Sequence, residues 1–150
     1  MARRDWEQGG ILLGQPYVSE HRYEAFIIEW IKKEFHSASI QREMHLHGRR
    51  PDIVVMNDSA MELIVEVKEE KWGYALEQAK YWKNLRISRR VCIGMPKWVW
   101  GKMLPRNRNM IRESGIGFLG ADESGNITHY AIPKDQNGKQ IHWPSSVSFY

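Results

Sequence analysis

The segment GRRPDIVVMNDSAMELIVEVKEE, residues 48–70, decides the fold of this chain. Two apolar-rich runs, 51–56 and 62–68, flank the short polar sequence Asn57-Asp58-Ser59, which is typical of a turn between antiparallel strands. The segment therefore predicts a β-hairpin. A buried charge is costly unless it is paired or bound to a metal, yet both runs carry charged residues. The charged residues that stand among the apolar residues of these runs are Asp52, Glu66 and Lys68.

Strand geometry predicts where these three side chains lie. Successive side chains of a strand point to opposite faces, so Glu66 and Lys68 share one face. If the two strands pair across the turn, Asp52 approaches Glu66 at the open end of the hairpin. Neighbouring carboxylates repel each other, and a divalent cation such as Mg²⁺, which prefers oxygen ligands, removes the conflict. A carboxylate pair with an adjacent ammonium group suits hydrolysis of phosphodiester bonds.

The rest of the pattern predicts an α/β domain. Apolar residues recur at helical spacing from Ser19, a potential N-cap, to about Phe35. The elements expected after this helix are a strand in 39–47, the hairpin, a helix over 73–85, a strand over 90–96, a partly helical stretch to 114, and a hairpin formed by 115–121 and 127–132. This order predicts a mixed central sheet flanked by helices.

The length predicts a single domain over residues 1–150. Its core is expected to span about 19–132, with 1–16 and 133–150 as peripheral arms.

Pro51-Asp52, followed after thirteen residues by Glu66-Val67-Lys68, resembles the PD-(D/E)xK motif of the restriction-endonuclease-like nuclease superfamily. The predicted order αβββαβ is similar to the core of that superfamily, and the resemblance covers about residues 19–96. The resemblance implies an Mg²⁺-dependent endonuclease, with Mn²⁺ as a substitute, that leaves 5′-phosphate and 3′-hydroxyl ends.

The resemblance also implies roles for individual residues. The catalytic set that it implies is Asp52, Glu66, Lys68, Glu24 and Gln78. Asp52 and Glu66 would hold the metal together with the Val67 carbonyl, and Lys68 would position or activate water and stabilise charge. Glu24, with Glu20 as second choice, would assist the metal site through a water molecule. Gln78, followed by Tyr81 on the next helix, would orient Lys68 or the phosphate.

The distribution of charge points to a polyanionic partner. The net charge is +4, and no acidic residue lies between Glu77 and Glu113. Such a one-signed block is typical of nucleic-acid binding. The basic residues expected to contact DNA phosphates are Lys80, Lys83, Arg86, Arg89, Arg90, Lys97, Lys102, Arg106 and Arg108. Trp82 is expected in the core, whereas Trp98 and Trp100 could either pack in the core or stack on bases.

Several alternatives stay open at this point. The single cysteine and the lack of a long apolar run indicate an intracellular, cytoplasmic protein without a membrane span. Cleavage of both strands of a duplex needs two sites, so a homodimer or larger homo-oligomer is expected. The enzyme could be of the homing, restriction or junction-resolving type. A non-catalytic nucleic-acid-binding module and an RNA-processing nuclease are the alternatives.

Overall fold

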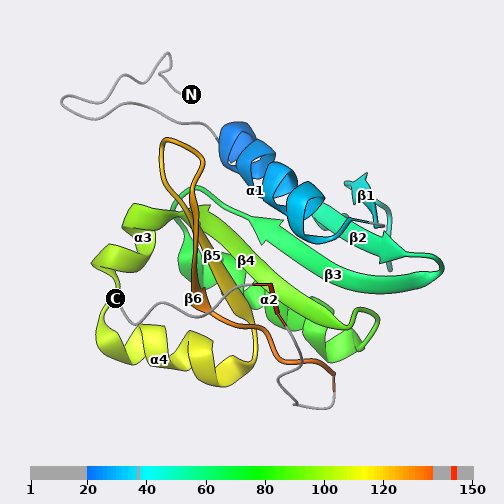
Figure 1. Cartoon of the computed structure of the whole chain (residues 1–150). Helices are drawn as coiled ribbons and strands as arrows, with labels where there is room; N and C mark the ends of the chain where they lie inside the picture. The colour runs from blue at the N-terminus through cyan, green and yellow to red at the C-terminus, as the bar shows by residue number, and fades with distance from the viewer. Residues whose placement is uncertain (1–19, 37, 137–142, 145–150) are drawn as a thin grey trace.

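A mixed six-stranded sheet forms the centre of the protein (Figure 1). The computed structural model describes residues 20–36, 38–136 and 143–144. The elements are α1 (Glu20–Glu34), β1 (Ser39–Arg42), β2 (Ile53–Asn57), β3 (Ala60–Val67), α2 (Trp72–Leu85), β4 (Arg90–Pro96), α3 (Lys97–Lys102), α4 (Pro105–Ser114), β5 (Gly117–Ala121) and β6 (Ile127–Ala131). The α/β class with a mixed sheet and flanking helices is therefore confirmed.

The strands lie in the sheet in sequence order, β1 to β6. The three central strands, β3, β4 and β5, are parallel, and the remaining neighbours pair antiparallel. The predicted hairpin is present as β2 and β3, and its turn places Asp58 at a φ of 57°, a conformation that Asp tolerates well. Ile53 pairs with Val65, so the next step of this register places Asp52 opposite Glu66.

Helices cover both faces of the sheet, with α1 on one face and α2 on the other (Figure 1). Alternation along the strands separates two apolar clusters. Val54 and Ile64 belong to the cluster beneath α2, α3 and α4, whereas Ile53 and Val65 belong to the cluster beneath α1. The even-numbered residues of β3 therefore face α2. None of the described helices has the length and apolar character to cross a membrane.

The strand expected in 39–47 is shorter than predicted, because β1 ends at Arg42. Glu43 and His47 adopt φ values of 52° and 51°, in the left-handed region that extended strands do not use. The chain instead forms a tight loop over 43–50, closed by backbone hydrogen bonds between Leu46 and Arg49. This loop carries Arg49 towards α2.

Some described residues beyond 132, the approximate core boundary expected from the sequence, also contribute to the interior. Pro133 and Trp143 are buried, and Trp143 packs against Trp30 in the cluster beneath α1. The indole Nε1 of Trp143 donates a hydrogen bond to Nδ1 of His129 (2.9 Å). Burial lowers the pKa of His129 to about 4, which keeps the imidazole neutral and able to accept this bond. Ser19, the expected N-cap, lies outside the described residues.

We expect the substitution Gly94→Ala to destabilise the protein by about 1–3 kcal/mol, because an added methyl group overpacks the core. A Cβ atom at Gly94 would lie 2.1 Å from Cδ1 of Ile27, so the Ile27 side chain between α1 and β4 would have to shift. Urea unfolding measures the change. Gly73→Ala is the matched control, because a Cβ there meets nothing within 4 Å. Equal unfolding midpoints for Gly94→Ala and the wild type would contradict the close packing.

Candidate active site

The two acidic residues of the hairpin meet at its open end. Glu66 lies near the end of β3 on the face covered by α2, and its side chain is only 4% exposed. Its Oε2 atom accepts a hydrogen bond from the indole Nε1 of Trp82 on α2 (2.5 Å). Asp52 directly precedes β2, and its Oδ2 atom accepts a hydrogen bond from the Val67 backbone N–H (2.7 Å). The side chains of Asp52 and Glu66 lie within hydrogen-bond reach of each other.

The environment raises the pKa of Glu66 to about 8. Burial is the largest cause, and the neighbouring Asp52 carboxylate is the second. The hydrogen bond from Trp82 acts in the opposite direction, since it favours the charged form. At neutral pH the metal-free pair therefore retains one proton, and a bound cation could take the place of that proton.

The donor atoms of this pair fit Mg²⁺. Each carboxylate uses one oxygen in a hydrogen bond that fixes its position, which leaves the other oxygen for a ligand. Among the described residues, no group of three His, Cys, Asp or Glu side chains could hold a metal ion. A cation at Asp52 and Glu66 would therefore complete its shell with the Val67 carbonyl, water and a phosphate, as Mg²⁺ often does.

Lys68 lies on the same face and at the same edge as the carboxylate pair. Its backbone N–H donates to the Gly94 carbonyl (3.1 Å), which ties this position to β4. Its Nζ atom lies 5.2 Å from the centre of the Tyr74 ring on α2. The structure thus brings Asp52, Glu66 and Lys68 together on one side of the sheet.

Glu24 makes its described hydrogen bond outside this group, and its expected part in the metal site, through a water molecule, stays a prediction. It projects from α1, on the opposite face of the sheet, and is 5% exposed. Its Oε2 atom accepts a hydrogen bond from Nε of Arg42 (2.7 Å) in a salt bridge. Arg42 pairs with Ile53, the residue after Asp52, and holds the Glu24 side chain through this salt bridge. The side chain of Glu20 lies outside the described part of the structure.

A cleft of about 750 Å³ opens beside Glu66, between the 43–50 loop and α2. We call it the α2 cleft. Its lining residues are Arg49, Arg50, Glu66, Tyr74, Glu77, Gln78, Lys80, Tyr81, Trp82 and Asn84. The Oε1 atom of Gln78 is buried and accepts no hydrogen bond from any described residue. A buried acceptor without a hydrogen-bond donor is unusual in a folded protein, and a ligand in the cleft could supply the donor.

Arg49 and Arg50 line the α2 cleft but are absent from the basic residues expected from the sequence, because they precede the basic block. Both are exposed on the 43–50 loop and both line the α2 cleft. The signal was present in the sequence, since the two arginines directly precede Pro51-Asp52.

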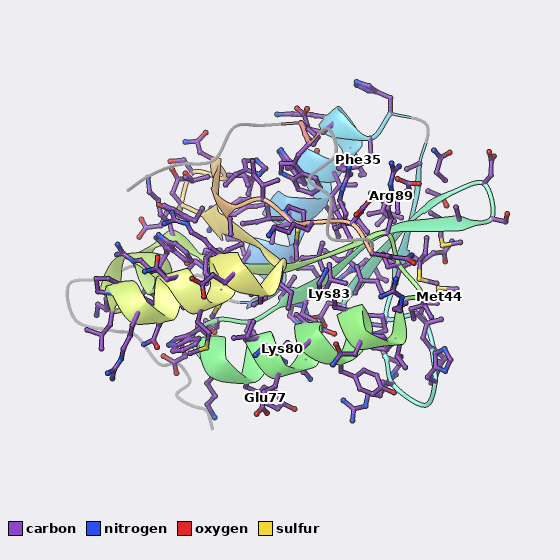
Figure 2. The ribbon with its side chains drawn as sticks, turned by 90° about the horizontal axis from the view of Figure 1, so that it is seen from below. Phe35, Met44, Glu77, Lys80, Lys83 and Arg89 are labelled. Atoms are coloured by element: carbon purple, nitrogen blue, oxygen red, sulfur yellow. The ribbon has the colours of Figure 1, made fainter. Side chains whose placement is uncertain are left out.

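The basic block divides into exposed and buried members. Figure 2 shows Lys80 and Lys83 along α2, with Glu77 on its outer side and Met44 of the 43–50 loop nearby. The members that line surface pockets on or beside α2 are Lys80, Lys83, Arg86, Arg89, Arg90 and Arg106. Lys97 and Lys102 lie apart from them, on α3.

Two members of the expected DNA-binding set also make contacts within the protein. Arg90 is 5% exposed, and its guanidinium carbon lies 5.4 Å from the centre of the Trp143 ring, so it is part of the interior. Arg108 donates to the backbone carbonyls of Trp100 (3.0 Å) and Gly101 (3.2 Å), which gives it a structural role. Of the three tryptophans in this region, Trp82 and Trp100 are buried and Trp98 is 47% exposed.

Trp82→Phe is expected to raise the pKa of Glu66 further, because it removes the hydrogen bond that favours the carboxylate. The phenyl ring keeps most of the apolar contact with the core, so the fold should persist. Carbon-13 NMR titration of the glutamate carboxyl groups measures the pKa directly. Trp98→Phe, at an exposed position on α3, is the control. A lower pKa in Trp82→Phe would contradict the assigned role of the indole.

Comparisons with known proteins reveal no relative of this chain. No family model, curated protein or solved structure matches it significantly. The case for a function therefore rests on the motif residues and their geometry.

Proposed function

We propose that this protein is a divalent-metal-dependent DNA endonuclease with a restriction-endonuclease-like core. It would hydrolyse phosphodiester bonds to leave 5′-phosphate and 3′-hydroxyl ends. One observation carries the proposal: Asp52 and Glu66 meet on the face that also carries Lys68, beside a cleft with exposed arginines. The order αβββαβ of the first six elements supports the proposed core.

The chain's own residues would divide the chemistry between them. Bound Mg²⁺ would supply Lewis acidity and an activated water nucleophile. Asp52 and Glu66 would hold it with the Val67 carbonyl, while Trp82 and the Val67 N–H keep the two carboxylates in place. The Lys68 ammonium group would stabilise the negative charge that develops on the phosphate in the transition state.

Gln78 would act as a positioning residue. Its side chain lines the α2 cleft with Glu66, and its buried Oε1 atom is free to accept a hydrogen bond. An ammonium group or a water molecule beside the phosphate is a suitable donor, so Gln78 would orient Lys68 or the attacking water.

The basic residues around α2 would supply affinity for the nucleic-acid backbone. Arg49, Arg50 and Lys80 line the α2 cleft, and further basic residues continue towards α4. Contacts to phosphates release counterions, so binding should weaken steeply as salt concentration rises.

Cleavage of a mixed panel tests the proposal. The panel contains supercoiled plasmid, linear duplex, branched DNA and structured RNA, each incubated with Mg²⁺, Mn²⁺ or a chelator, and the ends are mapped. We expect metal-dependent cuts in DNA with 5′-phosphate ends. Salt-sensitive binding without cleavage in either metal would instead indicate a non-catalytic module, and cuts confined to RNA would indicate a processing nuclease. Concerted cuts in both strands would call for a symmetric dimer, which sedimentation would reveal.

A further inference from the structure

The aromatic side chains of the α2 cleft are not explained by phosphate binding. Tyr74 lines the cleft, and its side chain is 54% exposed, which is high for a large aromatic residue. Tyr74 lies in the first turn of α2, and the Nζ atom of Lys68 is 5.2 Å from the centre of its ring. A phosphate that reaches Lys68 would therefore have an exposed aromatic ring beside it.

A second flat surface lies further along the same helix. The guanidinium carbon of Arg49 is 3.8 Å from the centre of the Tyr81 ring, so the 43–50 loop and α2 form a stacked cation–aromatic pair. Tyr74 and Tyr81 are seven residues apart, two helical turns, which places them on one side of α2 roughly 10 Å apart along its axis. Both line the α2 cleft, with Gln78 between them in sequence.

This arrangement distinguishes unpaired from paired nucleic acid. In a duplex the faces of the bases are stacked on each other and present only their edges in the grooves. Unpaired bases expose their faces, and proteins stack these on aromatic rings and on guanidinium planes. An exposed tyrosine and an arginine–tyrosine stack beside cationic groups therefore suit an unpaired strand.

We infer that the α2 cleft binds an unpaired stretch of nucleic acid next to the scissile phosphate, with Tyr74 and the Arg49–Tyr81 pair as stacking surfaces. This inference rests on the proposed function and specifies its substrate: a single strand, a flap or a frayed end. Lys68, Arg50 and Lys80 would form ion pairs with the phosphates of the strand. The amide group of Gln78 would form a hydrogen bond with it. Glu77 also lines the α2 cleft, and its carboxylate would repel the phosphates and keep them towards the basic residues.

Binding without cleavage tests the inference. Fluorescence anisotropy compares a 12-nucleotide single-stranded DNA, the same sequence as RNA, and a DNA hairpin closed by a non-nucleotide linker so that every base is paired, all in chelator. We expect the wild type to bind a single strand about tenfold more tightly than the hairpin, which is the gain in affinity expected when one or two bases stack on aromatic side chains. The DNA and RNA arms show which sugar the cleft accepts. A 2-aminopurine base in the single strand should lose fluorescence on binding, as stacking requires.

Matched variants separate stacking from charge. Tyr74→Ala should weaken single-strand binding about tenfold and leave hairpin binding unchanged, whereas Tyr74→Phe should bind like the wild type. Arg49→Lys keeps the charge and loses the planar surface, so it should also weaken single-strand binding selectively, by about fivefold. Trp98→Ala removes an exposed aromatic residue outside the α2 cleft and should have no effect.

Two outcomes would overturn the inference: hairpin binding as tight as single-strand binding, or equal weakening by Tyr74→Phe and Tyr74→Ala. Neither outcome touches the proposed function, which depends on metal-dependent cleavage of some polynucleotide. Conversely, preferential binding of single strands without any cleavage would refute the proposed nuclease activity and support the inferred binding site.

Discussion

Asp52→Asn abolishes metal-dependent cleavage, lowering the rate by at least about a thousandfold, if the two carboxylates hold the catalytic cation. The amide oxygen of Asn can still accept the hydrogen bond that Asp52 receives from the Val67 N–H, so the local fold should be preserved. The variant loses one of the two negative charges that attract the cation. Rates of plasmid nicking under single-turnover conditions measure the effect.

Double substitution tests whether the two carboxylates act as one unit. Groups that serve a single step are strongly non-additive, so Asp52→Asn combined with Glu66→Gln should be no slower than either variant alone. Glu62→Gln is the control, because Glu62 also lies on β3 but pairs with Arg89 away from the site.

Lys68→Ala should slow cleavage about a hundredfold while Mg²⁺ binding persists, since the ammonium group acts on the phosphate. An Asp52→Asn variant that retains wild-type rates would exclude the proposed metal site.

The raised pKa of Glu66 predicts a second large effect, on Mg²⁺ affinity. The cation must displace the proton that the pair retains below a pKa of about 8. The apparent association constant for Mg²⁺ should therefore rise about tenfold per pH unit from pH 6 to pH 8 and then level off. Calorimetric titration in two buffers of different ionisation enthalpy would detect the released proton.

The proton that Glu66 retains also makes the free energy of unfolding depend on pH. Glu66 ionises near 4.5 in the unfolded chain and near 8 in the folded metal-free protein, so the folded state holds one more proton between these values. The free energy of unfolding should then fall by about 1.4 kcal/mol per pH unit as pH rises through this window. His129 opposes this trend below pH 6.5, because its folded pKa is lowered to about 4. The fall should therefore be clearest from pH 6.5 to pH 8.

Glu66→Gln isolates this contribution. Its side-chain oxygen can still accept the Trp82 hydrogen bond, and it has no proton to lose. The difference in unfolding free energy between Glu66→Gln and the wild type should grow in favour of the variant up to about pH 8 in chelator. A difference that stays constant with pH would contradict a raised pKa of the buried Glu66 side chain.

The sequence predicts the hairpin and its charged face because both depend on local rules. The alternation of β3 places Glu66 and Lys68 together. The hairpin pairing follows from the turn at Asp58 except for a one-residue register shift between Val55 and Met56, which brings Asp52 opposite Glu66 and which the sequence did not predict. The helices and the β4 strand follow from similar periodicity. These features need no knowledge of distant contacts.

Features that depend on distant contacts were not predictable. The loop over 43–50 requires left-handed backbone at Glu43 and His47, which no residue pattern specified. Arg90 belongs to a charge run, yet packing against Trp143, more than fifty residues later, buries it. Glu24 has the right spacing on α1, but Arg42 of β1 binds it on the far face of the sheet. Trp82 looked like an ordinary core residue, and only the folded chain shows its hydrogen bond to Glu66.

Diffraction from crystals grown in Mn²⁺, recorded at the manganese absorption edge, locates a bound cation without ambiguity. We expect one strong anomalous peak bounded by the carboxylates of Asp52 and Glu66 and the carbonyl of Val67, with oxygen distances between about 2.0 and 2.3 Å. Crystals of Asp52→Asn should lose that peak. A strong peak elsewhere, or none while both carboxylates are well ordered, would show that Asp52 and Glu66 do not form a metal centre.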